Sequence, residues 1–370
     1  MNASSLENPM GRLISLDAMR GFTIAGMILV NYPASWEHIY PPLEHAEWDG
    51  LTPTDLVFPF FLFIVGVSIT LSFTKLLEKK TLKSALYKKI IIRAIKIFAV
   101  GIILSLIPNL EFGNIRFAGV LQRISIVFLA CSFIFLNTSP KFQARLGIFI
   151  LIVYWLSLTL IPTPGIGEVS LAKGVNLAAW VDSMLLPGRM WQGTWDPEGI
   201  LSTFPAIVTG ITGLLAGHLL LSKRTSYEKA VLLLVSGFIA IIAGYLWGLT
   251  FPVNKNLWSS SYVLVTSGLA SLVLGTMYYV VDIRNHTGGT KPGIIFGANA
   301  IAIYVLSDII SIVFYTMKFG SASLSQHFMA GLTAVGFAPA LASMLYAIIF
   351  VIINFFIAYF LYKRKIFIRL

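Results

Sequence analysis

The sequence predicts an all-α protein, a polytopic membrane helical bundle with about ten transmembrane helices. Two observations lead to this class. Apolar residues make up 57% of the 370 residues and charged residues only 12%, whereas a soluble domain is nearer half apolar and a quarter charged. Hydrophobic runs of membrane-spanning length also recur along the whole chain. We therefore expect residues 1–370 to form one membrane domain.

The hydrophobic runs predict ten spans. They lie near residues 13–31, 53–74, 90–108, 117–136, 146–162, 199–221, 229–249, 260–281, 294–317 and 336–362. Asp17 and Arg20 interrupt the first run, so we interpret it as a span and not as a cleaved signal peptide.

The distribution of Lys and Arg predicts that both termini lie inside. With that orientation the inner segments carry 20 of these residues and the outer loops only 5, as the positive-inside rule requires. Residues 32–52 and the long loop 162–199 then lie outside. The net charge of +11 is explained by an inner rim that faces anionic lipid, and it requires no nucleic acid partner.

Cysteine and histidine usage gives no indication of a metal. The single Cys131 excludes an intramolecular disulfide and a cysteine-based metal site. The five histidines are spread over different segments without a metal-binding spacing such as HExxH. They are His38, His45, His218, His286 and His327.

The first predicted helix has a polar face. Asp17, Arg20 and Asn31 fall on one side of a helix at 100° per residue, and the 14 positions from Asp17 to Asn31 correspond to about 21 Å. Asp17 and Arg20 are spaced to form an ion pair that anchors the helix end. Alternatively, Arg20 holds a phosphate, for which its guanidinium is well suited.

The outer loop 32–52 and the start of the second span contain the residues that are best suited to catalysis. His45 lies in this loop, and Asp55 follows ten residues later at the start of the hydrophobic run. Ionisable groups at such positions are expected to be functional. Asp55 either caps the helix or orients His45. The loop also holds four acidic residues and no Lys or Arg, so it would attract a protonated amine. They are Glu37, Glu44, Glu47 and Asp49.

Several motifs resemble one family in the same order along the chain. They are RLISLDAMRG from Arg12, VNY from Val30, HAEWDGLTPTDLVFPFFLFIVG from His45, GVLQRI from Gly119, WDPEGILST from Trp195, FPVNKNLWSSSYV from Phe251 and GANAIAIYVLS from Gly297. The chain thereby resembles the heparan-alpha-glucosaminide N-acetyltransferase family, which comprises a lysosomal membrane enzyme and bacterial relatives within the transmembrane acyltransferases.

The resemblance implies transfer of acetyl from cytoplasmic acetyl-coenzyme A to the amine of a terminal glucosamine on the other side of the membrane. It implies that His45 is the active-site histidine and that Asn31 is the family's VNY asparagine. It further implies a bacterial inner membrane as the location and allows a homodimer. The sequence departs from the lysosomal enzyme in this loop. It has three prolines between Asn31 and His45, where that enzyme is glycine-rich, and it has the acidic Glu47 and Asp49. These differences bear on the identity of the acceptor more than on the reaction.

Further site candidates follow from these motifs. For the acceptor we predict contacts with Trp48, Glu47, Asp49, Lys255 and Trp258. For acetyl-coenzyme A we predict contacts with Arg20, Asp17, Gln122 and Arg123.

Some of these residues have a structural alternative. Arg123 lies within a span and must pair, and Asp308 is one candidate partner. The turn with Lys255 either lines the entry for the acceptor or has a purely structural role. Asp196 is expected to cap the helix that begins near residue 199.

His45 can act as a general base or accept the acetyl group covalently, and we favour direct transfer. The Asn31 amide would then stabilise the oxyanion. Two other functions fit the sequence. A proton-coupled amino-sugar transporter would explain the intramembrane charges, but we see neither the inverted repeats nor the paired broken helices expected of one. An O-acyltransferase of a surface glycan would use similar chemistry but transfer the acyl group to a hydroxyl.

Overall fold

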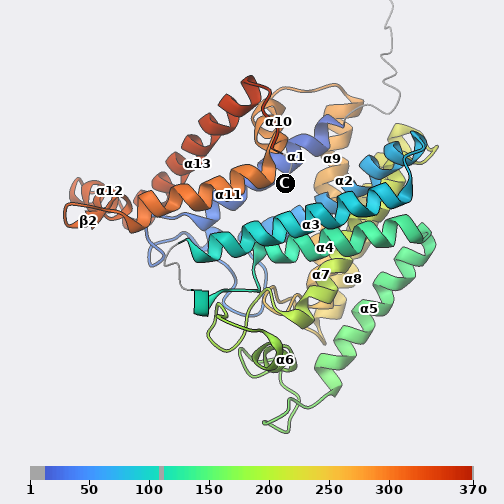
Figure 1. The fold of residues 1–370 in the computed structure, drawn as a ribbon, viewed down its shortest axis with the longest axis horizontal. Helices are drawn as coiled ribbons and strands as arrows, with labels where there is room; N and C mark the ends of the chain where they lie inside the picture. Colours follow the sequence, from blue (N-terminus) through green and yellow to red (C-terminus); the bar gives the residue numbers. More distant parts are fainter. Residues whose placement is uncertain (1–12, 108–111, 369–370) are drawn as a thin grey trace, which may run out of the picture.

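The computed structural model describes residues 13–107 and 112–368 and is built almost entirely of helices, which confirms the all-α prediction. Figure 1 shows their arrangement. The α-helices are α1 (Ile14–Asn31), α2 (Val57–Glu78), α3 (Lys83–Leu106), α4 (Val120–Asn137), α5 (Pro140–Leu160), α6 (Leu177–Leu185), α7 (Ile200–Leu221), α8 (Ser226–Gly248), α9 (Ser260–Met277), α10 (Thr290–Ala298), α11 (Ala300–Ser311), α12 (Leu324–Ala334) and α13 (Pro339–Lys363).

Short elements complete the fold. The 3-10 turns are η1 (Pro41–Leu43), η2 (Pro53–Leu56) and η3 (Phe112–Asn114), and the π-helical turns are η4 (Tyr278–Ile283) and η5 (Ile312–Thr316). Strands β1 (Lys318–Phe319) and β2 (Ala322–Ser323) pair antiparallel as a small hairpin before α12.

Eight helices in the described part of the chain are long and apolar enough to cross a membrane, and a ninth span results if α10 and α11 are counted as one bent segment. The third predicted run is helical but is not among them. It forms α3, in which every 18-residue stretch contains Lys89, Arg93 and Lys96. The last residue predicted for that run, 108, lies outside the described residues.

The ninth predicted run is broken. Helices α10 and α11 meet at 80°, with Asn299 between them. The Asn299 side chain binds the C-terminal segment, since its Nδ2 donates to the Ile366 carbonyl (2.9 Å) and its Oδ1 accepts from the Ile368 amide (2.8 Å). The predicted span 294–317 is therefore not one straight helix.

Glycines allow two pairs of helices to approach closely. Gly66 on α2 faces the backbone of α7, and Gly21 on α1 faces that of α10. At both positions a Cβ atom would overlap a backbone carbonyl of the facing helix. Small residues at helix contacts are typical of membrane bundles.

The polar segments gather at two ends of the bundle. At one end the loop 32–52 contacts the turn after α8, where the Gly50 amide donates to the Val253 carbonyl at 2.8 Å. It also contacts the loop 161–199, since Trp48 Nε1 donates to the Leu171 carbonyl at 3.0 Å. Segments predicted to share the outer side thus contact one another, although their orientation in a membrane stays a prediction.

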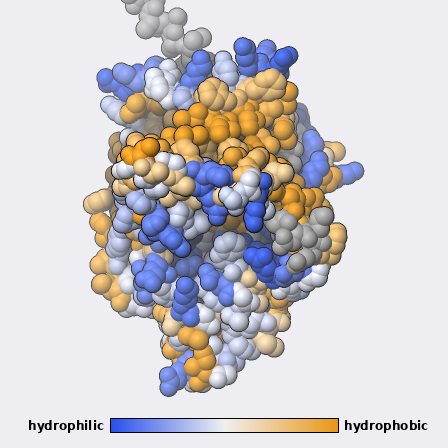
Figure 2. All heavy atoms as spheres, turned by 90° about the vertical axis from the view of Figure 1, so that its left-hand side faces the viewer, coloured by the Kyte–Doolittle hydropathy of each residue, from blue (hydrophilic) through white to orange (hydrophobic). Residues whose placement is uncertain are grey.

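Apolar surface separates hydrophilic regions on the face where α11, α12 and α13 lie. Figure 2 shows this surface across the upper half of the view, between hydrophilic side chains at the upper edge and a mostly hydrophilic lower half. Such a pattern suits a protein that is surrounded by lipid.

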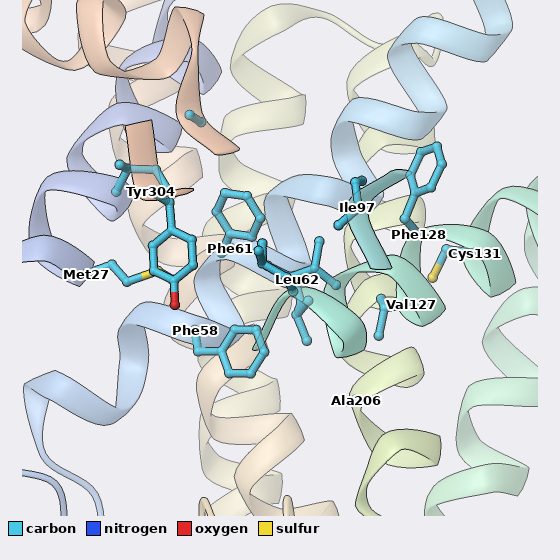
Figure 3. Close-up of a cluster of buried hydrophobic side chains, with 14 of the residues drawn as sticks. Met27, Phe58, Phe61, Leu62, Ile97, Val127, Phe128, Cys131, Ala206 and Tyr304 are labelled. Atoms are coloured by element: carbon cyan, nitrogen blue, oxygen red, sulfur yellow. The ribbon is translucent and has the colours of Figure 1, made fainter. Parts of the chain in front are cut away.

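The core lies where α1, α2, α3, α4, α7 and α11 converge. Figure 3 shows Met27, Phe58, Phe61 and Tyr304 within it, together with residues of α3, α4 and α7. These side chains are less than one-tenth exposed. The core therefore forms an apolar layer along α2, between the two ends of the bundle.

Candidate active site

His45 and Asp55 come together at the loop end of the bundle. The Nδ1 atom of His45 lies 2.6 Å from Oδ1 of Asp55. The His45 side chain is 42% exposed, whereas that of Asp55 is completely buried. A solvent-facing imidazole is therefore held from behind by a buried carboxylate.

Asp55 is held in turn by the backbone. Its Oδ2 accepts hydrogen bonds from the amides of Ala46 (3.1 Å) and Thr52 (3.0 Å). The Thr52 bond belongs to a capping box at the start of η2, which leads directly into α2. Asp55 thus makes both contacts that the sequence offered as alternatives, capping the helix and fixing His45. A carboxylate with this many donors has one stable position.

The partners of His45 assign its tautomer. A carboxylate only accepts hydrogen bonds, so the proton of the neutral ring sits on Nδ1 and donates to Asp55. The Nε2 atom then carries the lone pair of the ring, on a side chain that is partly open to solvent. This arrangement is suitable for a general base.

Lys255 contacts the same imidazole from a segment 210 residues away. Its Nζ lies 3.0 Å from Nε2 and 3.1 Å from Nδ1 of His45, and 4.0 Å from Oδ1 of Asp55. The Lys255 side chain is 18% exposed. Burial lowers the pKa of Lys255, and Arg123 acts in the same direction, while the acidic Glu198 and Asp55 oppose the change.

The turn that carries Lys255 is fixed to the acidic loop. Asn254 is buried, its Nδ2 donates to Oδ1 of Asp49 (3.0 Å), and its Oδ1 accepts from the Leu257 amide (2.8 Å). The Tyr262 hydroxyl donates to the Asp55 carbonyl at 2.6 Å. The structure therefore unites His45, Asp49, Asp55 and Lys255, which the sequence predicted separately.

The other residues predicted for the acceptor differ in exposure. Glu47 is exposed. Trp48 is half-buried, and its ring meets that of Trp195 edge-on at 5.6 Å between centroids. Trp258 is only 1% exposed, and its Nε1 donates to Thr209 Oγ1 at 3.1 Å. In this conformation Trp258 belongs to the core beneath the site.

Arg123 and Gln122, which were predicted to contact the donor, both have partners within the protein. Arg123 is 1% exposed, lies over the Trp258 ring at 5.0 Å, and donates to the Gly199 carbonyl and to Ser202. The predicted pair with Asp308 is wrong, because the Asp308 carboxylate accepts from the Tyr32 hydroxyl. Gln122 bonds to the Arg116 carbonyl at 3.3 Å.

Asn31 ends α1, and it makes no direct hydrogen bond with His45. Its neighbour Tyr32 is bonded to Asp308 as described above, which fixes the end of α1 against α11. The oxyanion role of Asn31 stays a prediction.

A network around Arg116 was not found from the sequence. Arg116 binds both carboxylate oxygens of Asp196 at 2.8 and 2.7 Å and that of Glu198 at 2.7 Å. Burial alone would raise the pKa of Asp196, but the Arg116 bonds hold it below the usual range. The one available signal was the scarcity of basic residues in the outer loops, which makes each of them notable.

Asp196 therefore does not cap the following helix as predicted. Helix α7 begins at Ile200, and its first amide donates to Oδ1 of Asp182 at 2.9 Å. Burial raises the pKa of Asp182 to about 6, although its bonds with the Ile200 and Asp196 amides oppose the change.

At the opposite end of the core lies a cavity of about 730 Å³. Its wall includes α1, α2, α3, α4 and the break between α10 and α11. Among the residues that the structure describes, four cationic side chains line it with a single carboxylate, that of Asp17; they are Arg20, Lys75, Arg93 and Lys229. The predicted pair of Asp17 and Arg20 is confirmed at 3.1 Å, and Arg20 also donates to Ser68 at 2.8 Å. Asn31 does not line this cavity.

The described residues, 13–107 and 112–368, contain no group of three or more His, Cys, Asp or Glu side chains that would hold a metal ion.

The fold and the two sites define a class: an integral, multi-pass helical membrane protein with a carboxylate-held histidine at one end and a cationic cavity at the other. A profile described as "Heparan-alpha-glucosaminide N-acetyltransferase, catalytic" matches residues 12–231. The chain belongs to the heparan-alpha-glucosaminide N-acetyltransferase family.

Relatives of that name agree with this assignment. Heparan-alpha-glucosaminide N-acetyltransferase of Homo sapiens is 33% identical over 352 residues, covering 80% of this chain and 52% of the human protein. The protein of the same name from Mus musculus is 30% identical over 395 residues, covering 90% of this chain and 59% of the mouse protein. The chain therefore spans a little over half the length of these relatives.

Proposed function

We propose that this chain is a membrane-embedded acetyltransferase that moves acetyl from acetyl-coenzyme A to the amine of a glucosamine-type sugar. One observation carries the proposal: the buried Asp55 carboxylate binds Nδ1 of the exposed His45, which leaves the Nε2 lone pair within reach of an amine, that of Lys255 at 3.0 Å. This is the geometry that a general base requires. The family and the names of its human and mouse members support an amine acceptor.

The cationic cavity is the proposed donor site. The guanidinium and ammonium groups of Arg20, Lys75, Arg93 and Lys229 suit the phosphates of coenzyme A. Ser68 lies thirteen positions after Asp55 along η2 and α2, which corresponds to about 20 Å. An extended coenzyme A molecule is comparably long, so a donor bound near Arg20 would extend its thioester towards His45.

The apolar core lies along this route. Phe61 lines the cavity, and Phe58 one turn away packs edge-on against Trp258 at 5.2 Å. Figure 3 shows Phe58 and Phe61 on α2 beside Met27 and Tyr304. We propose that the pantetheine arm displaces these side chains when the donor binds.

At the loop end the sugar ammonium would first lose one proton to solvent, and the resulting amine would attack the thioester carbonyl while it gives a second proton to Nε2 of His45. The C–N bond forms, the C–S bond breaks, and the proton passes to the coenzyme A thiolate. In the covalent alternative, Nε2 attacks first and carries the acetyl group to the amine. We propose that Glu44 and Glu47, which are exposed in the same loop, attract the protonated sugar.

The membrane arrangement is part of the proposal. Both termini and the cationic cavity would face the cytoplasm, with the loop 32–52 on the outer side. A bacterial inner membrane would provide acetyl-coenzyme A at the cavity side. A homodimer is compatible with this arrangement and is measurable as the mass of the purified complex.

The proposal is tested with purified protein, labelled acetyl-coenzyme A, and a panel of amines and hydroxylated sugars. We expect label on the amine of glucosamine and its loss in His45→Ala. His38→Ala is the matched control, because His38 is exposed in the same loop and should be dispensable. Arg20→Ala should raise the KM for the donor more than the KM for glucosamine.

The results separate the candidate functions. Label on a sugar hydroxyl would replace the proposal by an O-acyltransferase. Full activity of a folded His45→Ala protein would refute the role of His45.

One observation favours a transporter as second candidate. The break at Asn299 resembles the discontinuous helices of transporters, but it is a single break in the described residues and not a pair. Binding of glucosamine with uptake into proteoliposomes and no acetylation would support this alternative.

A further inference from the structure

We propose that Lys255 occupies the place of the acceptor amine and is itself acetylated when acetyl-coenzyme A is present without a sugar. This makes Lys255 a modification site within the catalytic centre. The inference rests on the proposed function, since it requires a bound acetyl donor and an active His45.

The first argument is position. The acceptor amine must come within hydrogen-bonding distance of the proposed base, and Lys255 Nζ already lies 3.0 Å from His45 Nε2. The same amine lies 3.1 Å from Nδ1 and 4.0 Å from the buried Asp55 carboxylate, whose charge attracts its ammonium form. A sugar amine that approached Nε2 would have to displace it.

The second argument is the environment of the amine. The Lys255 side chain is 18% exposed, and the turn that carries it is fixed by the buried Asn254. Burial disfavours an ammonium relative to an amine, and it lowers the pKa of Lys255. The reactive, uncharged form is therefore more accessible here than at a lysine in water.

The chemistry balances with acetyl-coenzyme A as the only co-reactant. After the ammonium has lost one proton to solvent, the Nζ lone pair attacks the thioester carbonyl. The Nζ–C bond forms, the C–S bond breaks, and its electron pair stays on sulfur. Nζ gives its second proton to His45 Nε2, which passes it to the thiolate. The products are Nε-acetyl-lysine and free coenzyme A.

The modification would change the site. Acetylation removes a positive charge from beside His45 and Asp55 and adds volume at Nε2. The amide does not return its acetyl group to a sugar amine, so each event removes one molecule from turnover. A sugar acceptor would protect the enzyme because it displaces Lys255 from Nε2.

The experiment uses the purified full chain with isotopically labelled acetyl-coenzyme A and no acceptor, followed by peptide mass spectrometry. Lys173 and Lys318 are exposed lysines in another loop and in the β1–β2 hairpin and report background chemical acetylation. We expect label at Lys255 to exceed theirs by about 10²-fold, the lower range of general-base catalysis. Excess glucosamine should suppress it.

Variants of His45 and Lys255 and treatment with hydroxylamine show how the label at Lys255 arises. His45→Ala should reduce the label at Lys255 to the background of Lys173, and thermal unfolding shows whether that variant is folded. His45→Asn is the second variant if it is not. Lys255→Arg keeps the charge and should abolish the label. Hydroxylamine should leave the Lys255 amide intact, whereas it removes acetyl from an imidazole.

Each outcome decides the question. Label at background level, or label that persists in both His45 variants, refutes the inference. If glucosamine is acetylated in the same preparation while Lys255 stays unlabelled, only this inference fails and the proposed function stands. If neither amine is acetylated, both fail. Label at Lys255 that depends on His45 supports the inference even where glucosamine is not a substrate.

Discussion

Replacement of Asp55 by asparagine should inactivate the protein without unfolding it. An asparagine fits the same space but has one donor end and one acceptor end. Oδ2 of Asp55 accepts the amides of Ala46 and Thr52, and Oδ1 faces His45. If the asparagine NH2 faced the two amides, two buried donors would lose their partners at about 1–3 kcal/mol each. Its carbonyl will therefore take the place of Oδ2.

That orientation points the NH2 group at His45 Nδ1. Nδ1 must then accept a hydrogen bond, so the ring proton moves to Nε2, and Nε2 no longer has a lone pair for the amine proton. We expect kcat to fall about 10²–10⁴-fold, the usual contribution of a positioned general base. The free energy of unfolding should fall by only about 1–3 kcal/mol, because the two amide bonds persist and one charge-assisted bond is lost.

The assay measures acetyl transfer to glucosamine alongside thermal unfolding and donor binding. Glu168→Gln is the control, because Glu168 is an exposed carboxylate in the other outer loop, 161–199, and has no role in the proposed site. It should retain activity near that of the wild type. The tautomer argument is refuted if Asp55→Asn keeps more than about a tenth of the wild-type kcat.

Three further predictions concern pH, packing and topology. The pKa of Asp182 is raised from 3.8 to about 6, so the folded state binds this proton more tightly than the unfolded state. The free energy of unfolding should therefore fall, by up to about 3 kcal/mol, as pH rises from about 4 to 6. Asp182→Asn should flatten this part of the pH profile in thermal unfolding, and an unchanged slope would contradict the prediction. Gly66→Ala should destabilise the bundle by about 1–3 kcal/mol or more, because a Cβ at this position meets the α7 backbone. Gly331→Ala is the control and should have little effect, because a Cβ there meets no atom within 4 Å. Equal stabilities of the two variants would argue against this contact. A cysteine at the exposed Trp36 should react with an impermeant thiol reagent added outside intact cells, whereas one at the exposed Ser84 should not, and the reverse pattern would overturn the orientation.

Local patterns predicted much of the fold because membrane spans are recognisable from composition alone. The runs that became α1, α2, α4, α5, α7, α8 and α13 have close to the predicted bounds. The run over 294–317 is equally apolar, but its break at Asn299 depends on hydrogen bonds to residues 366 and 368. Such a break is favourable only where a distant segment satisfies the freed polar groups.

The candidate site divides in the same way. His45 and Asp55 are ten residues apart, and the capping signal at Thr52 lies between them, so their proximity was accessible from the sequence. The approach of Lys255 was not, because it depends on how the turn before α9 packs against the loop before α2. The partner of Arg123 was not accessible either. The sequence indicated that this buried cation needs a partner, but only packing determines that the partner is Ser202 and not Asp308.

By itself the sequence determined a multi-pass helical membrane protein, its family, and the histidine and carboxylate of its loop. Hydrophobic length and short-range spacing encode these properties within a few dozen residues. Only the tertiary structure decided which cations surround the cavity, which amine lies beside His45, and where the bundle bends. These depend on helices that meet across hundreds of residues, and the distances between their side chains are set by packing.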